Sequence, residues 1–126
     1  MKRFASHYLF FPPNEVFKLH YIELDENNYF QGIFPLDKEI AKTSFHNGVL
    51  LPFKQEISPE HLLLILKEKE QTNPEKSIFQ LLEDQDFPEI RKNDVVFLYI
   101  LDGIDLLTAK FCTSNSRCNS YIQRFG

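Results

Sequence analysis

Residues 48–63 of the chain, GVLLPFKQEISPEHLL, contain a strand signal followed closely by a helix signal. The apolar run at residues 49–51 predicts a short buried strand, and the pair Asn47-Gly48 before it is typical of a turn. Farther along, Ser58 is a good helix N-cap and Pro59 suits the first helical position. The chain therefore passes here from strands to helices.

The part before this stretch reads as strands and turns. Apolar residues alternate with others between Phe4 and Phe10, which predicts a first strand that Pro12-Pro13 ends. A second strand is predicted at residues 17–21, with its buried side formed by Phe17, Leu19 and Tyr21. The polar residues 25–28 predict a hairpin turn. The return strand is residues 29–34, with Gly32 at a bulge.

The middle of the chain is predicted to be helical over residues 58–83. Leu62, Ile65 and Leu66 repeat at helical spacing, and we read this stripe as core contacts. Residues 73–75, Asn-Pro-Glu, repeat the capping pattern and predict the start of a second short helix. The apolar side of that helix contains Ile78, Leu81 and Leu82.

Strands return in the last third. Residues 95–101 are almost continuously apolar, which is typical of a strand covered on both faces. Asp102-Gly103 predicts a turn, and residues 106–111 and 117–124 predict weaker strands, the last at a sheet edge. The order of strands (2–52), helices (58–83) and strands (94–124) predicts one α+β domain over residues 1–126, β-sandwich-like, with two short helices inserted between its N- and C-terminal strands.

Composition restricts the classes of partner. The net charge is −4 and Lys and Arg do not cluster, so we expect no nucleic-acid binding. No apolar stretch approaches the ~20 residues of a membrane helix, and the start MKRFASHYLFF does not read as a signal peptide. We expect a cytoplasmic protein in which Cys112 and Cys118 are free thiols. The 13 Phe and 5 Tyr residues favour a β-rich core over an aromatic ligand platform.

No motif for catalysis or cofactor binding emerges. The histidines at positions 7, 20, 46 and 61 have no metal-ligand spacing, so we assign them surface or capping roles and expect no metal. Asp102 and Asp105 are read as structural. Ser114, Ser116 and Ser120 lie near the two cysteines without an identifiable base. The glycines are too dispersed to form a phosphate-binding loop, and no cofactor is expected.

Two stretches resemble the two ends of one enzyme superfamily. The first comprises residues 2–34, KRFASHYLFFPPNEVFKLHYIELDENNYFQGIF, together with FHNGVLLP at residues 45–52. The second is ISPEHLLLILKEKEQTNPEKSIFQLLEDQDFPEIRKNDVVFLYILDGIDL at residues 57–106. They resemble the N-terminal and C-terminal parts of the amidohydrolase superfamily, in its cytosine-deaminase-like and chlorohydrolase-like branch. The resemblance implies the small composite β-sandwich domain of those metal-dependent hydrolases.

The resemblance also implies what is missing. The family inserts a metal-bearing (β/α)₈ barrel of at least ~200 residues between these ends, and here only residues 53–56 separate them. The family pattern places a His-x-His pair just beyond Pro52, where this chain has Phe53, Lys54 and Gln55. No catalytic or metal-binding residue is therefore carried over.

We accordingly expect a non-catalytic remnant that acts as a protein-interaction or oligomerisation module. Loss of the barrel is expected to open one face for a homo-oligomer or a protein partner. The candidate surface residues are Phe53, Leu62, Ile65, Leu66 and Phe79. Two alternatives stay open: a hydrolase or deaminase relative that is active only with a partner subunit, and a small-molecule-binding α+β module.

Overall fold

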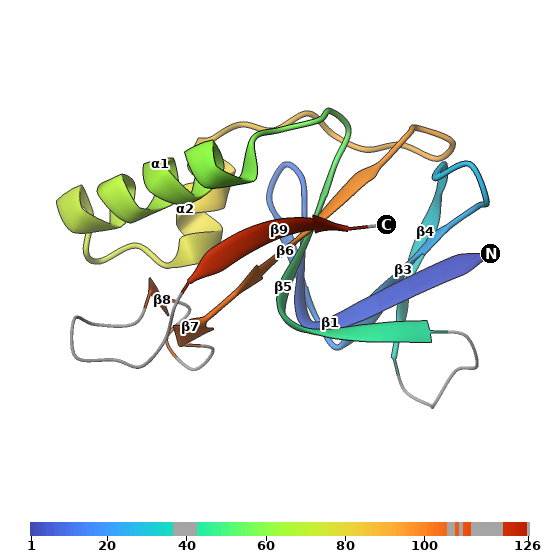
Figure 1. Cartoon of the computed structure of the whole chain (residues 1–126), viewed down its shortest axis with the longest axis horizontal. Helices are drawn as coiled ribbons and strands as arrows, with labels where there is room; N and C mark the ends of the chain where they lie inside the picture. Colours follow the sequence, from blue (N-terminus) through green and yellow to red (C-terminus); the bar gives the residue numbers. More distant parts are fainter. Residues whose placement is uncertain (37–42, 106–107, 109, 112–119, 126) are drawn as a thin grey trace.

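Strands from both ends of the chain join one mixed sheet, with helices packed at one end of it (Figure 1). The computed structural model describes residues 1–36, 43–105, 108, 110–111 and 120–125. The strands before the helices are β1 Lys2–Phe11, β2 Glu15–Lys18, β3 His20–Leu24, β4 Phe30–Pro35 and β5 Thr43–Phe53. The helices are α1 Pro59–Thr72 and α2 Ile78–Asp84. The remaining strands are β6 Phe97–Asp102, β7 Ile104–Asp105, β8 Lys110–Phe111 and β9 Tyr121–Phe125. The α+β class, with helices inserted between strands, is confirmed.

The sheet brings the first and last thirds of the chain together. Its strand order is β4-β3-β1-β5-β6-β9, and β2 pairs with the second half of β1. β1 and β5 are parallel, whereas the other neighbours in the sheet are antiparallel. Among the described residues β9 ends this order, so the prediction of a final edge strand is confirmed for that segment. The short strands β7 and β8 form a separate pair.

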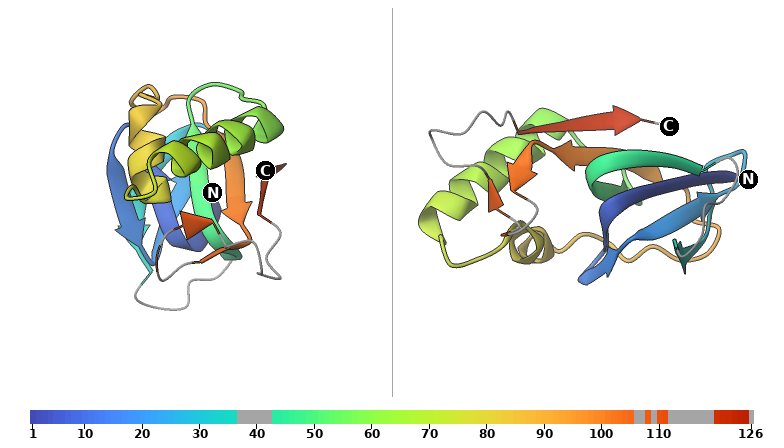
Figure 2. Two further views of the ribbon diagram at one scale, coloured as in Figure 1. Left: turned by 90° about the vertical axis from the view of Figure 1, so that its left-hand side faces the viewer. Right: turned by 90° about the horizontal axis from the view of Figure 1, so that it is seen from below.

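Helices α1 and α2 cover one face of the sheet at the end far from the N-terminus, as Figure 2 shows. α1 contributes Leu62 and Leu66 to a buried cluster, and α2 contributes Ile78, Leu81 and Leu82. The sheet supplies the following members of the same cluster: Phe10, Val49, Leu51, Phe53, Tyr99, Leu101 and Ile122. Because apolar burial is the main favourable term in folding, this cluster holds the helices to the sheet.

A second buried cluster lies on the opposite face. It includes Leu9, Phe11, Ile22, Leu24, Phe30, Leu50, Ile90, Val96, Leu98 and Ile100. Backbone hydrogen bonds close this side, because the turn before β4 pairs with the segment before β6. Phe30 N–H donates to the Asp94 carbonyl at 2.8 Å, and Val96 N–H donates to the Asn28 carbonyl at 2.9 Å. This clasp of residues 28–30 and 93–96 is reinforced by a β-bridge between Tyr29 and Val95.

The predicted turn at Asn47-Gly48 is wrong. β5 continues through both residues, and the extra residue is absorbed as a bulge, since Ser6 pairs with His46 but Tyr8 pairs with Val49. Gly48 has φ +98°, and a Cβ there would overlap the carbonyl oxygen of Leu101 on β6. Gly48 is therefore required by the close approach of two strands, not by a chain reversal.

The predicted second strand is divided in two. Leu19 has φ +55°, and this conformation separates β2 from β3. In β3 the residues at even positions, Ile22 and Leu24, face the core. Ile22 and Leu24 are buried, whereas Leu19 is exposed, so the predicted burial of Leu19 is wrong. A positive φ at one residue shifts the alternation of side chains, which the apolar pattern does not reveal.

The helical segment also differs at one point. α1 begins as predicted, with the Ser58 hydroxyl accepting a hydrogen bond from His61 N–H. α2 does not begin at residues 73–75, because Asn73 caps the C-terminus of α1. Its N-cap is Ser77, in a reciprocal capping box with Gln80. The hairpin turn at residues 25–28 and the bulge beside Gly32 are confirmed.

Candidate functional site

The candidate surface expected from the sequence is mostly buried. Phe53 and Leu66 have no solvent exposure and Leu62 is 5% exposed, so the expectation of an open surface at these three residues is wrong. The physical reason is that α1 and α2 themselves pack them against the sheet. Ile65 and Phe79 are half-buried, and the Phe79 ring lies 5.2 Å from the Tyr8 ring.

The histidines lie on separate elements. His7 is on β1, where its Nδ1 accepts a hydrogen bond from Gly48 N–H at 3.4 Å, and His46 is on β5. His20 begins β3 and packs against Phe17, while His61 is exposed in the first turn of α1. Within the described part of the chain, no three His, Cys, Asp or Glu side chains are grouped closely enough to hold a metal ion. Cys112, Cys118, Ser114 and Ser116 lie outside the described residues.

Asp102 stabilises the end of the sheet. One carboxylate oxygen accepts a hydrogen bond from Gly103 N–H at 2.7 Å, and the other accepts one from the Tyr121 hydroxyl at 3.2 Å. Partial burial of the phenol and the neighbouring Asp102 carboxylate raise the pKa of Tyr121. Ser120 Oγ donates to the Gly103 carbonyl on the same turn. These contacts agree with the structural role expected for Asp102.

Two exposed aromatic residues of the sheet, Phe34 and Phe45, lie in one cross-strand row. Tyr21 pairs with both Phe34 on β4 and Ala5 on β1, and Ala5 also pairs with Phe45 on β5. Residues in register lie on the same side of a sheet, so all four share one side. The alternate residues Phe4, Ile22 and Ile33 pack in the second cluster, so this row faces the other way. We call Ala5, Tyr21, Phe34 and Phe45 the aromatic face.

The aromatic face is open to solvent. Phe34 is 40% exposed and Phe45 is 48% exposed, whereas Ala5 between the strands that carry them is fully buried. The Tyr21 and Phe34 ring centres are 5.4 Å apart, and the His7 ring meets Phe45 edge-on at 5.3 Å. Such aromatic pairs hold the rings in defined positions. The face is therefore an ordered platform.

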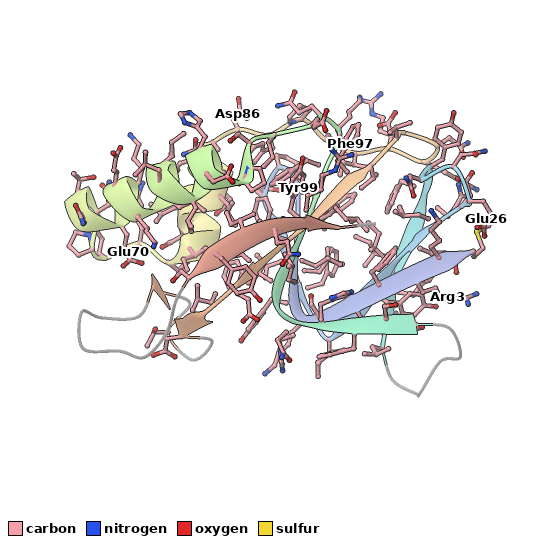
Figure 3. The ribbon with its side chains drawn as sticks, in the orientation of Figure 1. Arg3, Glu26, Glu70, Asp86, Phe97 and Tyr99 are labelled. Carbon is pink, nitrogen blue, oxygen red and sulfur yellow. The ribbon has the colours of Figure 1, made fainter. Side chains whose placement is uncertain are left out.

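An ion pair borders the aromatic face in the next row of residues. Arg3 pairs in register with Glu23, and its Nε lies 2.9 Å from the Glu23 carboxylate. Both side chains are largely shielded from solvent. Figure 3 shows Arg3 on β1 near the N-terminus, at the end of the molecule far from the helices. The aromatic row thus has a neutralised polar border.

Gly32 determines how the Phe34 ring lies. Its neighbour Phe34 folds back over it, and a Cβ on Gly32 would stand 2.8 Å from the tip of that ring. A larger residue at this position would push the ring away from the sheet. Gly32 therefore supports the platform as well as the bulge next to it.

A cavity of about 180 Å³ lies between the start of α1 and the loop after α2. Its apolar lining residues are Ile57, Leu62, Ile65, Phe87 and Pro88, and its polar lining residues are Gln55, Ser58, His61, Gln85 and Asp86. We call it the helix cavity. Leu62 and Ile65, two of the five surface residues expected from the sequence, line it.

Comparison with known protein families, with curated proteins and with solved structures gives no match to this chain. Within the described segments, no helix has the length and apolar character needed to cross a membrane. The geometry of the chain itself is therefore the basis for assigning a function.

Sequence reasoning missed the aromatic face. It assigned the Phe and Tyr residues to the core, which holds for Phe10, Phe30 and Phe53 but not for Phe34 and Phe45. Alternation along β4 marks Phe34 and Ile33 as lying on opposite sides, but it does not say which side is covered. The signal that identifies the face is the register between β4, β3, β1 and β5, which the apolar pattern alone does not supply.

Proposed function

We propose that this chain is a non-catalytic protein-interaction domain that binds its partner through the aromatic face. The observation that carries the proposal is the cross-strand row itself, in which Phe34 and Phe45 expose large aromatic surface on a rigid sheet. Exposed apolar patches on folded proteins commonly mark interaction sites, and aromatic residues are enriched among those that dominate binding energy.

The surroundings of the face fit the anatomy of an interface. Fully buried interface centres are depleted of charge, while their rims are polar. Here the charged residues of the neighbouring row, Arg3 and Glu23, already neutralise each other within the chain. A partner that covers the aromatic row therefore meets no isolated charge from this pair, which keeps the desolvation cost low.

We further propose that the domain is related to the small composite β-sandwich of the amidohydrolase superfamily and works in the cytoplasm. The resemblance expects N-terminal and C-terminal strands to share one sheet, and the strand order β1-β5-β6-β9 within one sheet supports this. In this proposal the chain retained a scaffold whose strands assemble without the barrel. Its partner is a second copy of the chain or another protein, which covers the aromatic face.

Light scattering tests the self-association form of this proposal. The wild-type chain is expected to show a mass above that of the monomer, rising with concentration. The double variant Phe34→Ser/Phe45→Ser is expected to return to the monomer, because both exposed rings are lost. Leu64→Ser is the matched control, since Leu64 is 56% exposed but lies on α1. A wild-type chain that stays monomeric at every concentration contradicts self-association.

Affinity capture tests the other form. The wild-type chain and the Leu64→Ser control are used as baits beside the Phe34→Ser/Phe45→Ser variant. A partner of the aromatic face is expected to be retained by the first two baits and lost from the third. If all three baits retain the same proteins in equal amounts, the aromatic face is not the interaction site.

A further inference from the structure

We propose that the helix cavity is a binding site for a neutral, single-ring aromatic molecule that carries a hydroxyl or amide group. This site is separate from the aromatic face and does not depend on the proposed function. Its walls come from α1, from the chain just before α1, and from the loop after α2.

The volume sets the size of the ligand. A cavity of about 180 Å³ is smaller than the several hundred Å³ typical of sites for drug-sized molecules. It compares with apolar cavities of roughly 150 Å³ that accept benzene. A single ring with a short substituent therefore matches the volume of this half-open cavity.

The apolar wall is held in a fixed position. Phe87 lines the cavity and packs on Phe53 with ring centres 4.2 Å apart, and Phe53 in turn packs on Tyr99 at 5.8 Å. Tyr99 is fully buried and its hydroxyl binds the backbone of Ile57, another lining residue. Figure 3 shows Tyr99 in the interior and Asp86 on the loop at the outer surface. A preformed apolar wall lowers the ordering cost of binding.

The polar lining is available to a ligand. Among the described residues, the side chains of Gln55, His61, Gln85 and Asp86 make no hydrogen bond to the protein, so they can bond to a molecule in the cavity. Glutamine amides both donate and accept hydrogen bonds, which suits a hydroxyl or an amide.

Charge decides against an anionic ligand. Asp86 is the one carboxylate among the residues that line the cavity, and neither lysine nor arginine lines it. A carboxylate on the ring would therefore meet a like charge with no lysine or arginine to compensate it. A neutral ring avoids this repulsion.

A pair of shape-matched probes tests the site by NMR. Benzyl alcohol is expected to cause saturable shifts in the methyl signals of Ile57 and Ile65, while benzoate is expected to bind roughly fivefold more weakly. Asp86→Asn should reduce that difference by strengthening benzoate binding with little effect on benzyl alcohol. Asparagine suits this position, because Asp86 has φ +55°.

Variants that fill the cavity provide a second test of the site. Ile65→Phe places a ring inside the cavity and is expected to abolish binding of benzyl alcohol. Leu64→Phe adds the same ring at an exposed neighbouring position on α1 and should leave binding unchanged. If Ile65→Phe loses the dispersed spectrum of a folded protein, Gln55→Trp, at another lining residue, repeats the test.

Three results would overturn the proposal. The first is the absence of saturable shifts with benzyl alcohol up to its solubility. The second is binding that survives both cavity-filling variants, which places the probe elsewhere. The third is equal binding of benzyl alcohol and benzoate to the wild-type chain, which removes the preference for a neutral ligand.

Discussion

The hydroxyl of Tyr99 binds both backbone polar groups of Ile57, accepting a hydrogen bond from its N–H at 2.9 Å and donating one to its carbonyl oxygen at 3.2 Å. Ile57 lies in the short segment that connects β5 to α1, outside any helix or strand. The buried side chain of Tyr99 on β6 therefore fixes the position of the connection between β5 and α1.

Tyr99→Phe should lower the free energy of unfolding by about 1–3 kcal/mol. The substitution removes both hydrogen bonds and leaves the Ile57 N–H and carbonyl without their partner. Urea unfolding monitored by circular dichroism measures the change. Tyr29→Phe is the control, because the Tyr29 side chain is 38% exposed and its bridge to Val95 is made by the backbone, so the loss of stability is expected to stay within about 0.5 kcal/mol. Equal losses in both variants would contradict the assigned role.

Gly48→Ala should destabilise the chain by about 2 kcal/mol or more. Its φ of +98° is strained for any residue with a side chain, and the new methyl group would overlap the Leu101 carbonyl oxygen. Thermal unfolding measures the effect. Ser44→Ala, at an exposed position on the same strand, should change little. A Gly48→Ala variant as stable as Ser44→Ala would show that β5 and β6 do not approach so closely.

Ser77→Ala should reduce stability by about 1 kcal/mol, because Ser77 and Gln80 cap α2 reciprocally. Glu75→Ala is expected to cost no more than about 0.5 kcal/mol, since Glu75 is exposed and precedes the helix. Denaturant unfolding of the two variants distinguishes them. A larger loss for Glu75→Ala than for Ser77→Ala would place the helix start at residues 73–75 instead.

The Tyr121–Asp102 contact should make stability depend on pH in the alkaline range. The pKa of Tyr121 is raised by partial burial and then by Asp102, so the folded chain holds the phenolic proton more tightly than the unfolded chain. This stabilisation is complete below the ordinary tyrosine pKa of about 10 and is lost as pH rises through the raised pKa.

Ultraviolet absorbance of the phenolate follows this titration. Asp102→Asn should move the pKa of Tyr121 part of the way back toward its ordinary value, because burial, the largest single cause, remains. An unchanged titration in Asp102→Asn would mean that Asp102 does not act on this phenol.

Features that depend on neighbouring residues in the sequence were predictable. Ser58 and Pro59 identify the start of α1, and the apolar run before Asp102 identifies β6. The start of α2 was misplaced because two capping signals lie close together, and the chosen one belongs to the turn after α1. Both signals are local, so the choice between them depends on how α2 packs.

Features that depend on distant strands were not predictable. Asn47-Gly48 looks like a turn in isolation, and only the approach of β6 explains why a glycine stands inside a strand. Leu19 breaks an alternating pattern through its backbone conformation, not through its side chain. The aromatic face was missed for the same reason, since it exists only once β1 separates β3 from β5.

The parallel pairing of β1 with β5 has a consequence for how the chain matures on the ribosome. β1 cannot pair with β5 until β5 has been synthesised. Residues 28–30 can form the clasp only later, once residues 93–96 have been synthesised. Contacts this distant in sequence slow folding, and uncovered strands are prone to aggregate meanwhile. We therefore expect chaperones to be needed most while only the N-terminal half of the chain has been synthesised.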